Sequence, residues 1–203
     1  MTALKIALLC ALPLAGLAQP GDSFGVPGKL RFHAESVYSP WSLVGSAAYA
    51  GILHGIGTPE EWGHGGGAYG KRFASTVACD GIHGALAFGL DSALRQDPRY
   101  YRSHATGFWR RTAGALRGTI LTRTDSGGES LSTWRLGSAY GAAFLSNQWY
   151  PGRLNTVRLG VLQGSLQLVA DFAGNLGAEF WPDVKRKILR RDHSRPLTLH
   201  RKP

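Results

Sequence analysis

The chain has 203 residues, 28 glycines, two cysteines and a formal net charge of +10. Its length is enough for one domain of ordinary size with its own core. The cysteine count excludes a four-cysteine metal site, and the positive charge is concentrated at the carboxyl end, where residues 183–203 hold eight Lys or Arg against two Asp.

Residues 1–18 have the features of a secretory signal peptide. An apolar run follows an early lysine, and the small residues Gly16 and Ala18 stand at the cleavage positions. The run has only twelve residues, too few to cross a bilayer of ~30 Å. The sequence therefore predicts export to the periplasm or cell envelope. Cleavage would leave Cys79 as the one cysteine, so no internal disulfide is expected.

Three regions are expected after the signal peptide. Residues 19–39 mix Gly, Pro and polar residues without a sustained period, which predicts an extended arm. Residues 40–182 predict a mainly α domain, a bundle of about five glycine-rich helices. Residues 183–203 form the basic tail.

The helices of this domain follow from apolar periodicity and from breakers. Residues 58–62 start a helix that lasts only one turn, and residues 123–130 are expected to be a loop. The residue before a proline resists helical angles, so Asp97-Pro98 and Trp181-Pro182 should each end a helix. No strand is expected between residues 40 and 182. The expected helices are 40–57, 68–96, 107–122, 132–149 and 154–180.

Small residues recur four apart in every expected helix. Each glycine inside a helix costs ~1 kcal/mol relative to alanine, so the pattern needs a compensating contact. Small-xxx-small faces let helices approach closely, which is common where lipid removes the hydrophobic drive for association. The pattern predicts a membrane-associated, glycine-zipper bundle, with a tightly packed soluble bundle as the alternative. The positions are Ala47-Gly51-Gly55, Gly81-Ala85-Gly89-Ala93, Gly114-Gly118, Gly137-Gly141, Gly160-Gly164 and Ala170-Gly174-Ala178.

The stretch "CDGIHGALAFGLDSAL" (79–94) places acidic and histidine side chains in a helix of small and apolar residues. Asp80 and Asp91 fall on one line of the helix, with Ala87 between them and His83 about 60° to one side. Their separation of about 16 Å exceeds the roughly 5–9.5 Å of paired catalytic carboxylates. We therefore expect no catalytic residue here. The candidates, should the protein be an enzyme, are Asp80, His83 and Asp171.

These acidic residues are expected to need cationic partners if they are buried. The helix at 107–122 offers Arg110, Arg111 and Arg117. In a lipid-embedded bundle, Asp80, Asp91 and Asp171 become functional candidates, because ionisable residues within a membrane are costly. In a soluble bundle they are structural ion pairs.

Other motifs give candidates for anion binding but none for a metal. "GGGAYGKR" (65–72) resembles a phosphate loop, yet Arg72 stands where that motif needs Ser or Thr to hold magnesium. Lys71, Arg72 and Arg110 are the anion-binding candidates. His54 and His64 lack the spacing of metal ligands. We expect no metal and no cofactor.

Aromatic residues are expected near the ends of the helices, where a membrane–water interface would place them. The alternative is that amphipathic rings cap the ends of an ordinary bundle. The residues are Trp41, Trp62, Trp109, Trp134, Trp149, Tyr150 and Trp181.

Five blocks in a fixed order resemble a family of exported, glycine-rich bacterial proteins of uncharacterised function. The resemblance covers about residues 40–184 and implies one compact domain with a dispensable arm and tail. It assigns no activity, cofactor or catalytic residue. The blocks are "AYGKRFAS" (68–75), "QDPRYY" (96–101), "TRTDSG" (122–127), "SNQWYP" (146–151) and "EFWPDV" (179–184).

The function expected from these features is non-enzymatic: an exported envelope protein whose helices pack in or on a membrane or self-associate as a homo-oligomer. The basic tail would contact a membrane or another anionic surface, and nucleic acid is not the expected partner. The alternative is a hydrolase or a small-ligand or lipid-binding protein that uses the Asp80–His83 line with Lys71, Arg72 or Arg110. A third hypothesis is polyanion binding through residues 185–202, with strong salt dependence.

Overall fold

The computed structural model describes residues 24–193, with side chains up to Arg186. The signal peptide expected at 1–18 and the last ten residues of the tail lie outside the described residues. The described chain is mainly α-helical, as expected. Its elements are α2 (Val26–Tyr38), α3 (Pro40–Gly55), the short 3-10 helix η1 (Glu60–Trp62), α4 (Gly66–Ala93), α5 (Phe108–Ile120), β1 (Leu121–Arg123), β2 (Glu129–Leu131), α6 (Thr133–Ser146), the 3-10 helix η2 (Asn147–Trp149) and α7 (Val157–His193).

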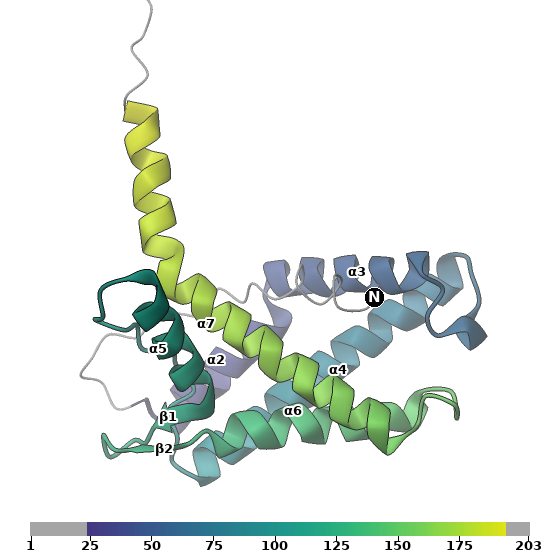
Figure 1. The fold of residues 1–203 in the computed structure, drawn as a ribbon. Helices are drawn as coiled ribbons and strands as arrows, with labels where there is room; N and C mark the ends of the chain where they lie inside the picture. Colours follow the sequence, from purple (N-terminus) through teal and green to yellow (C-terminus); the bar gives the residue numbers. More distant parts are fainter. Residues whose placement is uncertain (1–23, 194–203) are drawn as a thin grey trace, which may run out of the picture.

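Helix α4 is the centre of the arrangement (Figure 1). Helices α2 and α3 follow one another along one side of it, and α6 packs on another side. Helix α7 packs on α6, and α5 packs on α7. The contacts of α2 with α4, α4 with α6 and α5 with α7 join helices that are not consecutive in the chain, whereas α3 with α4 and α6 with α7 are consecutive.

Residues 26–38 are a helix, so the expectation of an extended arm is wrong for this part of the chain. Pro27 lies in the first turn of α2, where the missing N–H costs nothing. Three α2 residues spaced four apart, Lys29, His33 and Val37, are buried against α4. The period of four is present in the sequence, but two of these residues are polar and their partners lie more than 40 residues away.

Two short strands flank the segment expected to be a loop, which corrects the expectation of no strand between 40 and 182. Strands β1 and β2 are antiparallel, with Leu121 opposite Leu131 and Arg123 opposite Glu129. The Thr122 hydroxyl donates to the Asp97 carbonyl at 2.6 Å. The hairpin is thus held by the segment after α4, a contact that strand periodicity does not reveal.

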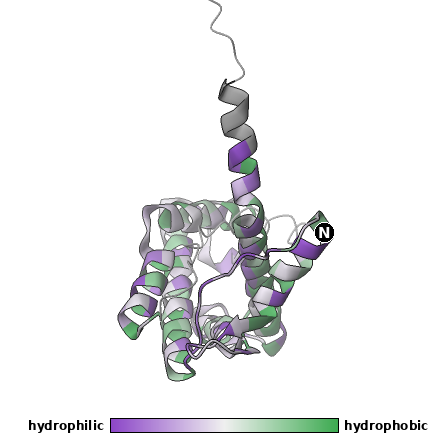
Figure 2. Ribbon diagram, turned by 90° about the vertical axis from the view of Figure 1, so that its left-hand side faces the viewer, coloured by the Kyte–Doolittle hydropathy of each residue, from purple (hydrophilic) through white to green (hydrophobic). Residues whose placement is uncertain are grey.

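Helix α7 does not end before Pro182; it continues to His193. Arg111 of α5 holds the two sides of this proline together. Its guanidinium donates to the Glu179 carboxylate at 2.9 Å, to the Glu179 carbonyl and to the Asp183 carboxylate. The last turns of α7 stand away from the bundle (Figures 1 and 2).

Several of the expected glycine faces are notches that receive a large side chain, rather than sites of backbone-to-backbone contact. A Cβ on Gly137 of α6 would lie 2.6 Å from Leu90 of α4. A Cβ on Gly164 of α7 would lie 2.3 Å from the ring of Tyr140 of α6. Other positions of the pattern are open, since nothing lies within 4 Å of a Cβ on Gly89.

The interior of the described bundle is polar, and many large apolar residues lie on its outer surface. No Leu, Ile or Phe among the described residues is buried; the buried hydrophobic residues are mostly alanines. The largest side chains that are almost fully buried include Arg72, Lys29, Glu179, Asn147 and Asp91. Figure 2 shows apolar and near-neutral residues along most of the bundle helices and hydrophilic residues on the protruding turns of α7.

One described helix, α4, is long and apolar enough to cross a membrane by length and composition. Only 17% of its most apolar 18-residue window is buried inside the bundle. A helix with these properties can also be the core helix of a soluble protein, but such a helix is mostly buried. Most of the other residues in the middle of α4 are half-buried, and the exposed ones there are small, such as Ala74, Ala78 and Ala85.

Candidate functional site

The candidate site is the set of polar side chains that α2, α4, α6 and α7 turn towards one another, which we call the polar interior. Its members are Lys29 and His33 on α2, Asp80, His83 and Asp91 on α4, Arg135 and Ser138 on α6, and Gln167 and Asp171 on α7.

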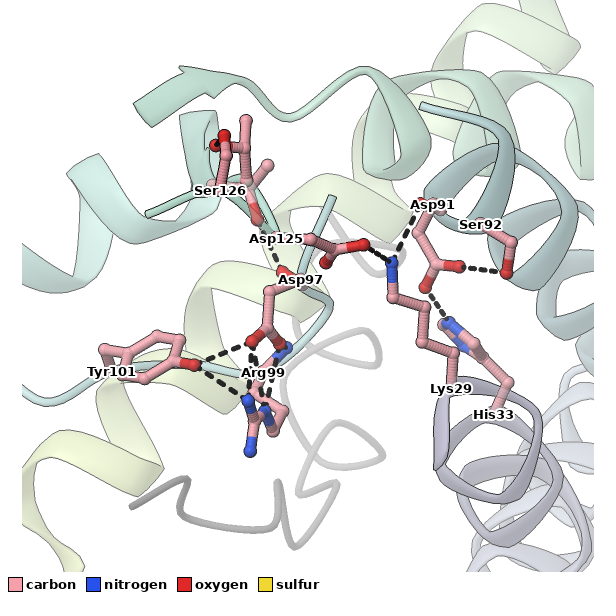
Figure 3. Close-up of polar contacts among 11 residues, drawn as sticks. Lys29, His33, Asp91, Ser92, Asp97, Arg99, Tyr101, Asp125 and Ser126 are labelled. Atoms are coloured by element: carbon pink, nitrogen blue, oxygen red, sulfur yellow. Dashed lines mark hydrogen bonds and ion pairs between the residues drawn. The ribbon is translucent and has the colours of Figure 1, made fainter. Parts of the chain in front are cut away.

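The first part of the polar interior surrounds Asp91 near the end of α4 (Figure 3). The His33 Nε2 atom lies 2.6 Å from the Asp91 carboxylate. The Lys29 ammonium donates to the Asp91 carbonyl at 3.1 Å and to the Asp125 carboxylate at 2.9 Å. Because Lys29 and Asp91 are almost fully buried, these bonds stabilise charges that would otherwise be costly to remove from water.

Asp80 and His83 each have a serine partner on a different helix. The Ser46 hydroxyl of α3 donates to the Asp80 carboxylate at 2.8 Å. The His83 Nε2 atom lies 3.2 Å from the Ser138 hydroxyl of α6. These contacts direct the two side chains to opposite neighbours of α4, so the structure does not assemble them as an acid–base pair.

Asp171 lies against Arg135, which completes the polar interior. The Arg135 Nε atom is 3.5 Å from one Asp171 oxygen, and the Gln167 amide donates to the other at 3.2 Å. Arg135 also donates to the Gly118 carbonyl at 2.8 Å and lies 4.5 Å from the centre of the Trp134 ring. The oxygen of Asp171 that faces Arg135 makes no hydrogen bond within the described part of the chain.

The expected pairing of these acids with arginines of the third helix is wrong. Asp91 pairs with His33 and Asp171 pairs with Arg135, while Asp80 bonds to a serine. The α5 arginines bind other acids: Arg111 contacts Glu179 and Asp183, and Arg117 contacts Glu129. Helix α5 packs on α7 rather than on α4, which removes it from reach of Asp80 and Asp91.

The three anion-binding candidates differ in whether their side chains are free to bind an anion. Arg72 is fully buried, and all three of its guanidinium nitrogens bind the chain. It donates to the carbonyls of Thr58, Pro59 and Gly63 and so holds the turn before α4. Its donors are not free for an external anion. Lys71 and Arg110 are both exposed.

A second polar cluster, around Glu179, was not foreseen. The Tyr100 hydroxyl and the Ser103 amide both donate to one Glu179 oxygen at 2.9 Å. The other oxygen accepts from Arg111 at 2.9 Å. Burial, together with the bond to Glu179, raises the pKa of Tyr100. Tyr100 is therefore a neutral donor that joins the segment after α4 to α7.

The signal for this cluster was a polar residue at every fourth position of α7. A row of residues four apart winds slowly around a helix, and along this row Asp171 binds α6 while Asn175 and Glu179 bind α5. The sequence at α7 therefore indicates a winding row of polar residues that can reach more than one neighbouring helix. The positions are Gln163, Gln167, Asp171, Asn175, Glu179 and Asp183.

A third cluster occupies the segment directly after α4 (Figure 3). Arg99 donates to both oxygens of the Asp97 carboxylate, and the Tyr101 hydroxyl donates to it at 2.6 Å. Burial raises the pKa of Asp97, but the bonds from Arg99 and Tyr101 outweigh burial and hold it below its usual value. Burial and the bond to Asp97 raise the pKa of Tyr101 to about 12.

An apolar groove of about 710 Å³ lies between α4 and the α2–α3 junction. Tyr38, Leu43 and Phe73 line it together with small residues of α4. Neither Asp80 nor His83 lines this groove. No group of three or more His, Cys, Asp or Glu among the described residues is placed to hold a metal ion.

Comparison of the chain with protein-family models, with curated proteins and with solved structures finds no match. The resemblance to exported glycine-rich proteins therefore stays a prediction. The functional conclusion rests on the geometry above.

Proposed function

We propose that this protein is a non-enzymatic, membrane-embedded helical bundle of the cell envelope. The observation that carries the proposal is the distribution of side chains, with charged residues inside the bundle and large apolar residues outside. Trp41 is 74% exposed and Val44 is 59% exposed, whereas Arg72 and Asp91 are fully buried. A protein that folds in water has the opposite distribution, because burial of large apolar groups drives its folding.

A lipid surrounding accounts for both halves of this distribution. Ionisable residues within a membrane face the bundle interior and pair with one another, as Asp91 does with His33. Lipid tails are as apolar as leucine, so helices associate through close packing and hydrogen bonds. The notch at Gly137 that receives Leu90 and the bond between Asp80 and Ser46 are contacts of these two kinds.

The length and charge pattern of α4 support the same proposal. Its 28 residues correspond to about 42 Å, more than the ~30 Å hydrocarbon core of a bilayer. Charged residues lie near its two ends, at Arg72 and Asp91. Between them, Asp80 and His83 bond to α3 and α6 rather than facing outwards.

The basic carboxyl end supplies a second contact with a membrane. Lys185 and Arg186 are exposed near the carboxyl end of α7. Basic clusters beside a membrane bind anionic lipid headgroups. We propose that this end of the chain lies on an anionic surface, and that residues 187–203 add to the same charge.

The alternative of a hydrolase or ligand-binding site at Asp80 and His83 has no comparable support. Both side chains are bound to serines within the bundle, and the apolar groove on α4 does not include them.

Fractionation of a bacterial envelope that contains the full chain tests the proposal. Membrane pellets are washed in high salt, then in alkaline carbonate, then in detergent, with a known integral protein and a known periplasmic protein as controls. We expect release by detergent alone. Release by salt would show that only surface charge holds the protein, and recovery in the soluble fraction would overturn the proposal.

A further inference from the structure

The inner face of helix α5 is occupied by contacts with other parts of the chain. Gly114 and Gly118 admit Ser103 and Tyr100 of the preceding segment, since a Cβ on either glycine would lie within 3 Å of these side chains. Thr119 accepts a hydrogen bond from the Asn175 amide of α7 at 2.9 Å. Together with the Arg111–Glu179 bond, these contacts fix which face of α5 points outwards.

The outer face of α5 is apolar and largely exposed. Trp109, Ala113, Leu116 and Ile120 follow one another at steps of three or four residues and therefore form one stripe. Trp109 is 79% exposed, and Leu116 and Ile120 are about half exposed. This stripe continues into an apolar cleft of about 220 Å³ that Leu116 and Ile120 form with Leu136 of α6 and with Leu168, Val169 and Phe172 of α7.

The charge around this stripe has one sign. Every charged residue from Pro98 to Thr124 is an arginine. Arg99, Arg111 and Arg117 are matched by acidic residues elsewhere in the fold. Arg110 is exposed and has no acidic partner among residues 24–186.

The position of α5 places this face at one end of the bundle. Its hydrogen bonds and ion pairs with α7 run from Asn175 to Asp183, beyond Asp171, which pairs with the first turn of α6. That turn lies at the end of α4, since Gln96 accepts a hydrogen bond from the Trp134 amide. If α4 crosses a membrane, α5 is located at the level where the hydrocarbon core meets the headgroups.

We propose that the outer face of α5 lies in the boundary layer of an anionic phospholipid membrane, with Trp109, Leu116 and Ile120 among the acyl chains and Arg110 on the headgroup phosphates. A helix with an apolar stripe, an interfacial tryptophan and flanking arginines has the composition of interfacial helices. This inference rests on the proposed membrane function and names the element and the lipid chemistry. A second copy of the chain fits less well, because two Arg110 side chains would be brought together.

A spin label at position 113 tests where the stripe lies. The full chain carrying Ala113→Cys, Cys10→Ala and Cys79→Ala is reconstituted into vesicles of phosphatidylcholine mixed with phosphatidylglycerol, and a label introduced by Ser126→Cys in the hairpin turn, in place of Ala113→Cys, is the control. We expect the label at 113 to be accessible to oxygen and shielded from a water-soluble nickel reagent, with the reverse at 126. Access to nickel at 113 would overturn the proposal, as would shielding from both reagents, which indicates a protein contact.

The requirement for anionic lipid is tested at Arg110. Phosphatidylglycerol is titrated into the detergent-solubilised protein, with a fluorophore at position 113 as the reporter. Since each arginine near an anionic surface contributes about 1 kcal/mol, we expect Arg110→Gln to weaken affinity about fivefold and Arg110→Lys to preserve it. Equal affinity in all three proteins would refute the headgroup contact.

An alkaline carbonate wash of the same vesicles separates the two proposals. Protein that resists the wash while the label at 113 faces water supports the membrane-embedded bundle and refutes the role of α5. Protein that the wash removes, although its label was shielded from nickel before washing, refutes membrane embedding and supports surface binding by α5.

Discussion

The inner and outer faces of α4 carry opposite kinds of residue. The inner face presents Arg72 and Asp91, which are fully buried and hydrogen-bonded to other segments. The outer face presents Ala74, Ala78 and Ala85, which are exposed. The difference shows that the helices are held together by polar contacts and by notches at glycine, and not by a core of large apolar side chains.

Lys71 and Arg72 are adjacent in α4, but Lys71 is exposed and Arg72 is buried. Replacement of Arg72 gives the largest expected effect on stability. Arg72→Met should lower the free energy of unfolding by more than about 3 kcal/mol, because three carbonyls lose their donor and each unsatisfied group costs about 1–3 kcal/mol. Lys71→Met should change it by less than about 0.5 kcal/mol, since Lys71 is exposed. Denaturant unfolding of the solubilised protein, followed by circular dichroism, measures both.

Equal effects at the two positions would mean that the buried contacts of Arg72 do not stabilise the turn before α4. Arg72→Lys sharpens the result, because lysine keeps the charge but cannot bind three carbonyls at once. We expect it to recover only part of the lost stability.

An intermediate effect is expected where a glycine notch is filled. Gly164→Ala should destabilise by about 1–3 kcal/mol, because the added Cβ would lie 2.3 Å from the Tyr140 ring close to its attachment. Gly89→Ala, at an open position, should instead stabilise by up to about 1 kcal/mol through helix propensity. Thermal unfolding of the two variants distinguishes the notch from the open face. A stability change of the same sign at both positions would contradict this distinction.

The smallest effect is expected from the titration of the cluster around Asp97. The pKa of Asp97 is held below its usual value, so the contribution of this carboxylate to stability is present above about pH 4 and is lost as pH falls through the lowered pKa. The pKa of Tyr101 is raised to about 12, so its contribution is present below about pH 10 and is lost as pH rises towards 12.

Unfolding midpoints measured across pH for the parent protein and for two variants isolate these contributions. The difference between the parent and Asp97→Asn should shrink as pH falls below about 4, and the difference between the parent and Tyr101→Phe should shrink as pH rises towards 12, because each variant lacks the titrating group. A difference that does not vary with pH would show that the Asp97 cluster adds nothing through its titration.

Much of the fold was predictable from local patterns. The expected helix at 40–57 is α3, and those at 68–96, 107–122 and 132–149 correspond to α4, α5 and α6 with η2, to within a few residues at their ends. Local breakers such as Gly and Asp-Pro act within a few residues of where they stand, so sequence alone locates these ends.

The candidate site was predictable only in part. The inward orientation of Asp80, Ala87 and Asp91 follows from helix geometry and agrees with the burial of Ala87 and Asp91. Their partners do not follow, because His33 was expected in an extended arm and Ser46 carries no charge to mark it.

The sequence by itself determined that the chain is mainly helical, that its helices carry glycine at regular steps, and that α4 has one polar line. Each of these properties depends on residues within a few turns of one another. Only the tertiary structure decided that residues 26–38 are helical, that α7 passes through Pro182 and that Asp171 pairs with Arg135. Those outcomes depend on side chains brought together from distant parts of the chain, where local propensity has no information.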